Sequence, residues 1–226
     1  MPTGRRHGAF TAPVSAVLAI PAGRIQFVAA DRADTTVEVL PANTAKSGDV
    51  NAAEQIQVTY GDGVLRIEAP EPKNRILGDF GSVEVTVQLP AGSRIEARAA
   101  SAELRGVGRL GDVAFEGGYR SVKLDEAASA RLTALDGDVQ VGRLGGDAEI
   151  STQRGDIQIT EALRGTVTLR TQQGDITVGA ARGVSASLDA GTSYGRISNT
   201  LKNTDGTPGL TVHATTSYGD ITARSV

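Results

Sequence analysis

The sequence contains no cysteine and no tryptophan, and aromatic residues make up only 4% of its 226 residues. The absence of cysteine excludes a disulfide framework, a thiol nucleophile and a zinc–thiolate site. Hydrophobic residues account for 39% and are mainly Val, Ile, Leu and Ala, which favours thin, layered β packing over a bulky core. The 28 glycines among 226 residues are a larger share than the usual one of about 7%. This excess of glycine indicates many tight turns.

Strong charge and long hydrophobic runs are also lacking. The formal net charge is −3 and no run of Lys or Arg is longer than two residues, so no nucleic-acid partner is expected. No apolar stretch reaches the ~20 residues that span a bilayer. We therefore expect no transmembrane segment.

The N-terminus has some features of a short signal peptide. A basic start at residues 5–7 precedes the apolar stretch Ala9–Ile20, but from Val14 onward the side chains alternate with the period of a strand. We therefore predict a cytoplasmic protein, with association with the cell envelope as the alternative.

Residues 1–96 have the pattern of an N-terminal β region made of paired strands. Tyr60–Val64 contains an Asp-Gly turn that predicts a hairpin. Leu18–Ile25 and Leu89–Ile95 share a Pro-Ala-Gly turn, which predicts the same strand–turn–strand unit twice. Loops are expected at 41–54, with at most one helical turn, and at 70–81. The predicted strands are Val14–Ile20, Arg24–Ala29, Thr36–Leu40, Gln55–Tyr60, Val64–Ala69 and Ser82–Leu89.

From residue 97 onward a repeat takes over, marked by a glycine, usually an aspartate, and then Val or Ile. An apolar anchor precedes each repeat glycine by 5, 5, 5, 7 and 7 residues, and the glycines are 18, 19, 21 and 24 residues apart. The repeats are Gly137-Asp138-Val139, Gly155-Asp156-Ile157, Gly174-Asp175-Ile176, Gly195-Arg196-Ile197 and Gly219-Asp220-Ile221, and the anchors are Leu132, Ile150, Leu169, Leu188 and Val212.

This repeat predicts an all-β fold, with residues 97–226 forming a β-solenoid of ~18–24-residue coils that continues from the N-terminal β region. Each coil has two short strands of alternating polarity, such as Asp147–Thr152 and Asp156–Thr160. One coil cannot bury its apolar row, whereas stacked coils bury a continuous column. Ile157 and Ile159 should point inward, and Gln158 outward.

The aspartates of the repeat should line up as a ladder. Stacked carboxylates could bind calcium, as in β-roll repeats, but those repeats are about half as long. The favoured interpretation is that each aspartate accepts hydrogen bonds from backbone N–H groups of the turn. Arg196, placed by sequence order between Asp175 and Asp220, would relieve their repulsion. No cofactor is expected, and the weak calcium candidates are Asp138, Asp156, Asp175 and Asp220.

A chemically variable position lies three residues before the apolar residue of each glycine motif and should form a line along one edge. Tyr194 and Tyr218 share the string Thr-Ser-Tyr-Gly and should stack on one another, with stacking on a sugar ring as the alternative. The line comprises Tyr119, Asp136, Arg154, Gln173, Tyr194 and Tyr218, of which Tyr119, Arg154, Tyr194 and Tyr218 are the candidate surface-binding residues.

No catalytic constellation is recognisable. The two histidines, His7 and His213, have no plausible partner in the sequence, and there is no nucleophile elbow, P-loop or metal-spaced histidine pair. Polysaccharide-cleaving β-helical enzymes use acid pairs beneath long loops, whereas the turns here are short. We predict a non-enzymatic binding or scaffold protein with a protein or glycan ligand; a polysaccharide-active enzyme is the least favoured alternative.

The end of the chain suggests self-association. The last repeat, Leu210–Ile221, is followed by only five residues, which leaves little sequence to cap an exposed strand edge. A homo-oligomer is therefore expected.

Several segments resemble a known family. They are Ile20–Asp34, Leu89–Ile95, Leu110–Val113, the Gly-Asp-Ile repeats and Thr216–Thr222. The chain resembles the bacterial DUF4097 family of β-strand-repeat proteins, labelled "putative adhesins", in its actinobacterial form. The resemblance implies a β-solenoid-like fold and assigns no catalytic or binding residue. Some relatives with this domain act at the cell envelope in responses to antimicrobial peptides, so it also implies an envelope stress role as an alternative function.

Overall fold

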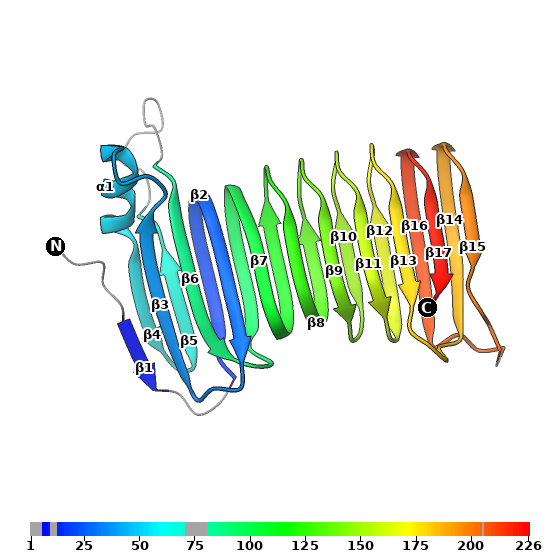
Figure 1. The fold of residues 1–226 in the computed structure, drawn as a ribbon, viewed down its shortest axis with the longest axis horizontal. Helices are drawn as coiled ribbons and strands as arrows, with labels where there is room; N and C mark the ends of the chain where they lie inside the picture. The colour runs from blue at the N-terminus through cyan, green and yellow to red at the C-terminus, as the bar shows by residue number, and fades with distance from the viewer. Residues whose placement is uncertain (1–5, 10–12, 71–80, 205) are drawn as a thin grey trace.

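The computed structural model describes residues 6–9, 13–70, 81–204 and 206–226. One helix, α1 (Ser47–Gln55), accompanies the strands of this described part, which confirms the all-β prediction (Figure 1). The strands are β1 (Arg6–Ala9), β2 (Ser15–Ala30), β3 (Asp34–Pro41), β4 (Gln57–Gly61), β5 (Val64–Glu68), β6 (Val83–Pro90), β7 (Arg94–Gly117), β8 (Val122–Thr133), β9 (Val139–Leu144), β10 (Ala148–Ser151), β11 (Ile157–Ala162), β12 (Gly165–Arg170), β13 (Ile176–Ala180), β14 (Ala186–Tyr194), β15 (Ile197–Thr200), β16 (Leu210–Tyr218) and β17 (Ile221–Ser225). No helix in these ranges has the length and apolar character needed to cross a membrane.

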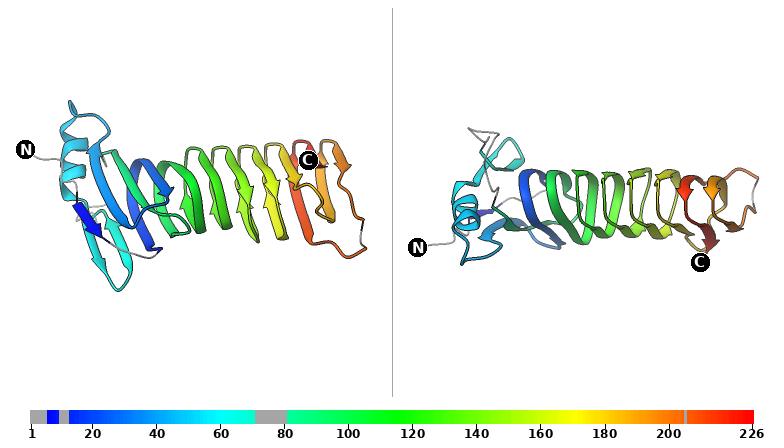
Figure 2. Two further views of the ribbon diagram at one scale, coloured as in Figure 1. Left: turned by 60° about the horizontal axis from the view of Figure 1, so that its bottom comes forward. Right: turned by 90° about the horizontal axis from the view of Figure 1, so that it is seen from above.

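The strands form two long rows that face each other across the core (Figures 1 and 2). Row A contains β5, the first part of β2, the first and last parts of β7, the second part of β8, then β10, β12, β16 and β14. Row B contains β6, the second part of β2, the middle of β7, the first part of β8, then β9, β11, β13, β17 and β15. Neighbouring strands within each row are parallel, so the chain passes from row to row and returns one coil further along.

The core lies between the rows and is built from equivalent residues of successive coils. Ile157 pairs directly with Ile176, and Ile159 with Val178; all four are at most 1% exposed. Gln158 between them is exposed. The alternation that the sequence predicts is therefore confirmed, because inward positions of one coil stack on inward positions of the next.

The apolar anchors of the repeat need one correction. Leu169 pairs with Ala214, and Ala214 pairs with Ala190, so these alanines, rather than Val212 and Leu188, are the equivalent residues in the last two repeats. Counted from them, the repeat glycine always follows five residues later. The predicted change in the anchor-to-glycine gap from five to seven residues was therefore wrong. In the last two repeats alanine occupies the anchor position, so an earlier large apolar residue was counted as the anchor instead.

The order of the last two coils differs from the order of the sequence. β16 pairs with β12 on one side and β14 on the other, and β17 pairs with both β13 and β15. The coil at 210–225 is thus inserted between the coils at 165–180 and 186–200 (Figure 1). The prediction that Leu210–Ile221 forms the exposed end was wrong, because the outer coil is β14–β15.

The residues of the outer coil suit an end that meets water only in part. Asn199 pairs with Ala223 and so places a polar side chain where inner coils have an apolar one, as a terminal coil in water needs. Ile197, in contrast, leaves an apolar side chain 47% exposed, whereas its neighbour Ile221 is 1% exposed.

The other end of the stack is built differently. Strands β3 and β4 run antiparallel to β6 and β5, and α1 lies over this end (Figure 2). In the β4–β5 hairpin, Asp62 and Gly63 have φ of 52° and 77°, which confirms the predicted Asp-Gly turn.

Helix α1 occupies much of the loop expected at 41–54. Its composition is a weak signal, and tertiary contacts hold it: Asp49 is buried, its Oδ1 accepts the N–H of Ser82 at 2.8 Å, and Ala52 and Ala53 pack against the core. Most of the loop expected at 70–81 lies outside the described residues.

The two Pro-Ala-Gly segments do not form the same unit. The first lies within the continuous strand β2, whereas the second is a turn between β6 and β7. Gly23 has a φ of +135°, and a Cβ there would lie 1.8 Å from the carbonyl oxygen of Val83; Gly92 stands in open space. The shared Pro-Ala-Gly sequence predicted the same conformation in both segments. The conformation instead depends on the strand that lies beside each segment.

Candidate functional site

The turns from row A to row B carry the aspartate ladder. Oδ1 of Asp138 accepts the backbone N–H of Asp156 at 2.9 Å, and Oδ1 of Asp156 accepts that of Asp175 at 2.8 Å. Oδ1 of Asp175 then accepts the N–H of Asp220 at 2.7 Å, and Oδ1 of Asp220 accepts that of Arg196 at 2.8 Å. Each carboxylate thus bonds the next coil rather than its own turn.

This geometry explains the aspartates without a metal. In each turn, a carboxylate oxygen of the aspartate accepts the backbone N–H of the equivalent residue in the next coil. In the described part of the chain, no group of three or more His, Asp or Glu side chains is placed to hold a metal ion. The calcium alternative gains no support from the four candidate aspartates.

Arg196 ends the ladder instead of interrupting it. The sequence order predicted a position between Asp175 and Asp220, but the inserted coil places Asp220 next to Asp175 and Arg196 beyond both. The Arg196 guanidinium donates to Oδ2 of Asp220 at 2.8 Å. The arginine therefore neutralises the last carboxylate of the row.

The pKa of Asp220 lies below its ordinary value, chiefly because the Arg196 side chain donates to the carboxylate and secondly because the Arg196 backbone N–H does. A lowered folded pKa stabilises the fold above the unfolded value of about 3.9, and this contribution is lost as the pH falls through the folded value. In Arg196→Gln, we expect carboxyl-carbon NMR titration to show a higher pKa for Asp220. Arg131→Gln, which removes the partner of Glu149, should leave Asp220 unchanged; an equal shift in both variants would contradict the assignment.

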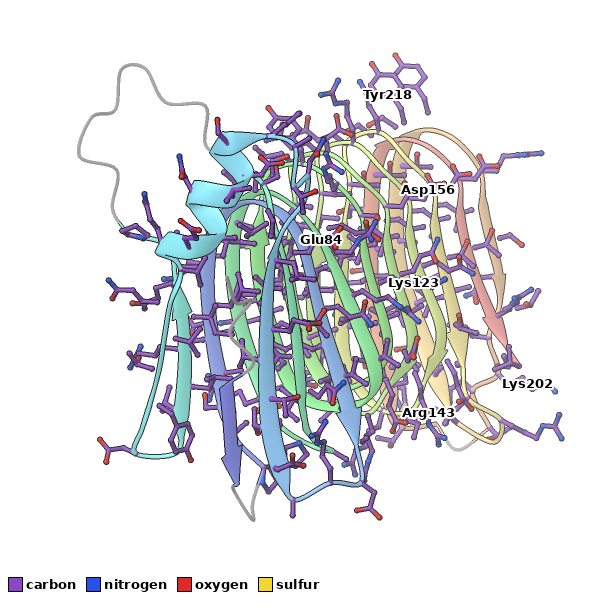
Figure 3. All side chains as sticks on the ribbon, turned by 60° about the vertical axis from the view of Figure 1, so that its left-hand side comes forward. Glu84, Lys123, Arg143, Asp156, Lys202 and Tyr218 are labelled. Carbon is purple, nitrogen blue, oxygen red and sulfur yellow. The ribbon has the colours of Figure 1, made fainter. Side chains whose placement is uncertain are left out.

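The variable positions of the repeat form a line on the same turns, which we call the turn column. Residues one coil apart bridge directly, and Tyr194 pairs with Tyr218 at the outer end. Figure 3 shows Tyr218 and Asp156 at this edge, with Arg143 and Lys202 at the opposite one. In spatial order the turn column is Tyr119, Asp136, Arg154, Gln173, Tyr218 and Tyr194.

The outer end of the turn column is a stacked tyrosine pair. The ring centroids of Tyr194 and Tyr218 are 5.0 Å apart and the ring planes differ by 3°. The two residues are 68% and 55% exposed. The predicted stacking of the two tyrosines is present, and stacking on a sugar ring stays a prediction.

The rest of the turn column mixes charge with one more aromatic ring. Nη2 of Arg154 lies 2.8 Å from Oδ2 of Asp136, and Tyr119 is 54% exposed at the inner end. Four candidate residues therefore lie along one edge, although Tyr119 is separated from the tyrosine pair by three coils of polar side chains.

The contact made by His213 was missed in the sequence analysis. Its Nδ1 lies 3.3 Å from Oδ2 of Asp189, because β16 and β14 are direct neighbours in row A. The spacing of one 24-residue repeat was the available signal. Both side chains are well exposed, and the hollow beside them is lined by Thr168, Arg170 and Thr215. This hollow is open and shallow, and it brings no further acid to the histidine.

The arrangement of paired rows, stacked turns and in-register coils extends over nearly the whole chain. The family model described as Toastrack DUF4097 matches residues 17–225. The chain belongs to the DUF4097 family. The Toastrack match confirms the family resemblance, and comparison with curated proteins found no match for this DUF4097 chain.

Solved structures resemble this Toastrack chain along its full length. A "putative adhesin" from Bacteroides fragilis is 17% identical, with 97% of this chain and 95% of that chain covered and a TM-score of 0.50. A "putative adhesin" from Parabacteroides distasonis is 16% identical, covers 99% and 96%, and has a TM-score of 0.46. A "putative lipid binding protein" from the same species is 11% identical, covers 97% and 96%, and has a TM-score of 0.45. At these identities the likeness concerns the fold.

Proposed function

We propose that this DUF4097 chain is a non-enzymatic binding scaffold, a β-solenoid that presents its turn column to a protein or glycan partner. The observation that carries the proposal is the exposed stack of Tyr194 and Tyr218 on a hydrogen-bonded turn. Tyrosine offers a large contact surface with a polar tip, and it is enriched where proteins bind partners.

The scaffold holds these rings in place. The N–H of Gly219 donates to the carbonyl of Tyr194 at 3.0 Å, and that of Gly174 donates to the carbonyl of Tyr218 at 2.9 Å. Both tyrosines therefore sit on backbone that is bonded from coil to coil. Because the backbone is fixed and the two rings stack on each other, each ring loses less conformational entropy on ligand binding than a side chain on a flexible loop does.

Many acidic side chains of the repeat region have structural partners, which supports a non-enzymatic role. The aspartates of the ladder accept backbone N–H groups, and acids on the flat faces pair with arginines one coil away. These pairs are Arg98–Glu116, Arg131–Glu149 and Arg143–Glu161. An acid–base pair for sugar cleavage would need carboxyl groups converging on a substrate groove.

The name of the Bacteroides fragilis structure, "putative adhesin", agrees with a binding role. We extend the proposal to a scaffold of actinobacterial type in the cytoplasm, with an adhesin-like or stress-response role at the cell envelope as the alternative that depends on export. Fractionation of the native cells tests the location: recovery of the chain with the envelope would favour the alternative role in envelope stress.

The experiment is a binding screen on a glycan array and on immobilised bacterial cell-wall polysaccharides. For a ligand found there, we expect Tyr194→Ala and Tyr218→Ala each to raise the dissociation constant about tenfold, the size of effect that truncating a central aromatic contact produces. Tyr60→Ala, which removes a partly exposed tyrosine from the β4–β5 hairpin, is the matched control and should bind normally.

Two outcomes would contradict this function. Binding that is indifferent to both tyrosines would remove the turn column from the proposal. Release of soluble sugar from any polysaccharide, lost on a single carboxylate substitution, would show an enzyme.

A further inference from the structure

The outer coil leaves one edge of each row unpaired. Within the described residues, β14 has β16 as its strand partner and β15 has β17. The N–H of Ala186 at the start of β14 bonds the carbonyl of Lys202, but in the part of the chain that the structure describes no strand follows β14 or β15 on the outer side (Figure 1). One end of the stack therefore presents two strand edges with unpaired backbone groups, one edge in each row.

These edges lack the features that usually protect an edge from pairing. Protected edges carry lysine, proline or a bulge, whereas the sequences of β14 and β15 contain no lysine or proline and their ladders run without a register shift. Asp189 is their one charged residue, and it faces His213. Ile197 adds exposed apolar surface.

The opposite end of the stack is built from different elements. There α1 lies over the rows, and its Ala52 and Ala53 pack against the core. One row continues through the antiparallel strand β3 to the short strand β1, and the other ends in the antiparallel edge strand β4. A head-to-tail contact would need both ends to be complementary, whereas a twofold contact needs only the outer coil.

We propose that two copies of this chain associate tail to tail through their β14–β15 coils. A twofold axis that brings β14 against β14 of the second copy reverses the strand direction, so the edges pair antiparallel, and the same holds for β15. The result is a closed dimer in which the stack continues from one copy into the other.

A second copy fits this end better than a foreign strand does. The end presents two edges, one in each row, and another copy presents two edges at the same separation. An extended peptide would cover one row and leave the other open. The inner edges of the same two strands already pair with a two-stranded coil of this chain, β16–β17.

The contact is small, since it involves a nine-residue and a four-residue strand from each copy. Interfaces at the low end of the size range are weak. The dimer should therefore form with rising protein concentration, and it does not depend on any ligand of the turn column.

The first test is sedimentation equilibrium from about 10 μM to 1 mM, the range in which weak interfaces of this size form. The average mass should rise toward twice that of the monomer. Ile197→Lys places a charge at the contact and should raise the dissociation constant at least about tenfold, while circular dichroism remains unchanged because Ile197 is half-exposed. Thr59→Lys, on exposed strand β4 at the opposite end, should leave the dissociation constant unaltered.

The second test uses the absence of cysteine in the chain. Ser198→Cys places a single thiol on β15 and should give a covalent dimer with a short bis-maleimide. Thr59→Cys should stay monomeric with the same reagent. A monomer at every concentration, a ladder of higher oligomers, or equal crosslinking of the two variants would overturn the proposal.

Discussion

Replacing Gly155 with alanine should destabilise the protein by about 2 to 6 kcal/mol, because backbone strain and overpacking in a tight structure each cost about 1 to 3 kcal/mol. Gly155 has a φ of +135°, where side chains are rarely tolerated. An added Cβ would lie 2.3 Å from the carbonyl oxygen of Gly137 and 2.5 Å from its carbonyl carbon. Both atoms belong to the backbone of the preceding coil, so neither can move without breaking the stack.

Urea denaturation followed by circular dichroism measures this loss as a lower midpoint. Gly191→Ala in β14 is the matched control, because no heavy atom lies within 4 Å of its added Cβ and its φ is not in the positive region. Alanine there should be neutral or stabilise by up to about 1 kcal/mol. Equal losses in both variants would mean that glycine content, and not the contact between coils, determines the stability.

The same contact explains why much of the fold can be predicted from the sequence. Each turn lies against the turn of the preceding coil, so the glycine and aspartate recur at the same place in every repeat. Asp156 and Asp175 therefore occupy equivalent positions, and both accept a backbone N–H from the next coil. The alignment of the turn column follows from the same repeat, because residues at equal distances from the motif must share an edge.

The order of the coils could not be predicted in this way. A coil at 210–225 satisfies the same inward pattern whether it lies last or is inserted, since Val212 meets an apolar residue in either place. Few residues distinguish the two possible orders of the coils. They are Asn199 at an inward position and the alanines at positions 190 and 214, which replace a large anchor. The contact of His213 with Asp189 does not depend on this order, because β14 and β16 are neighbours in either arrangement; the spacing of one repeat between the two residues was the available signal.

Helix α1 was missed for a different reason. Its first five residues, Ser-Gly-Asp-Val-Asn, are weak helix formers, and a helix of this length is marginal without tertiary contacts. The hydrogen bond of Asp49 to the backbone of Ser82 joins segments 33 residues apart, which no local pattern in the sequence records. Packing against the end of the stack, rather than propensity, determines this element.

The inserted coil predicts a second large effect. Val212 is fully buried, and it pairs with Val167 on one side and Leu188 on the other. In Val212→Asp a carboxylate would enter a dry core, which costs several kcal/mol. Because β14 and β15 have their strand partners in β16 and β17, residues 186–200 should lose their order together with the substituted coil.

Hydrogen–deuterium exchange measures this directly. We expect amides at 186–200 and 210–225 to exchange faster by at least about a hundredfold, the factor that nearly 3 kcal/mol of lost local stability gives, while those at 139–162, in the coils that do not contact β16 or β17, stay protected. Thr211→Asp, one residue away on the half-exposed outer face, should change exchange little. Persistent protection at 186–200 in Val212→Asp would mean that this coil rests directly on β12 and β13. In that case the inserted position of the last coil, and with it the identity of the open end, would be wrong.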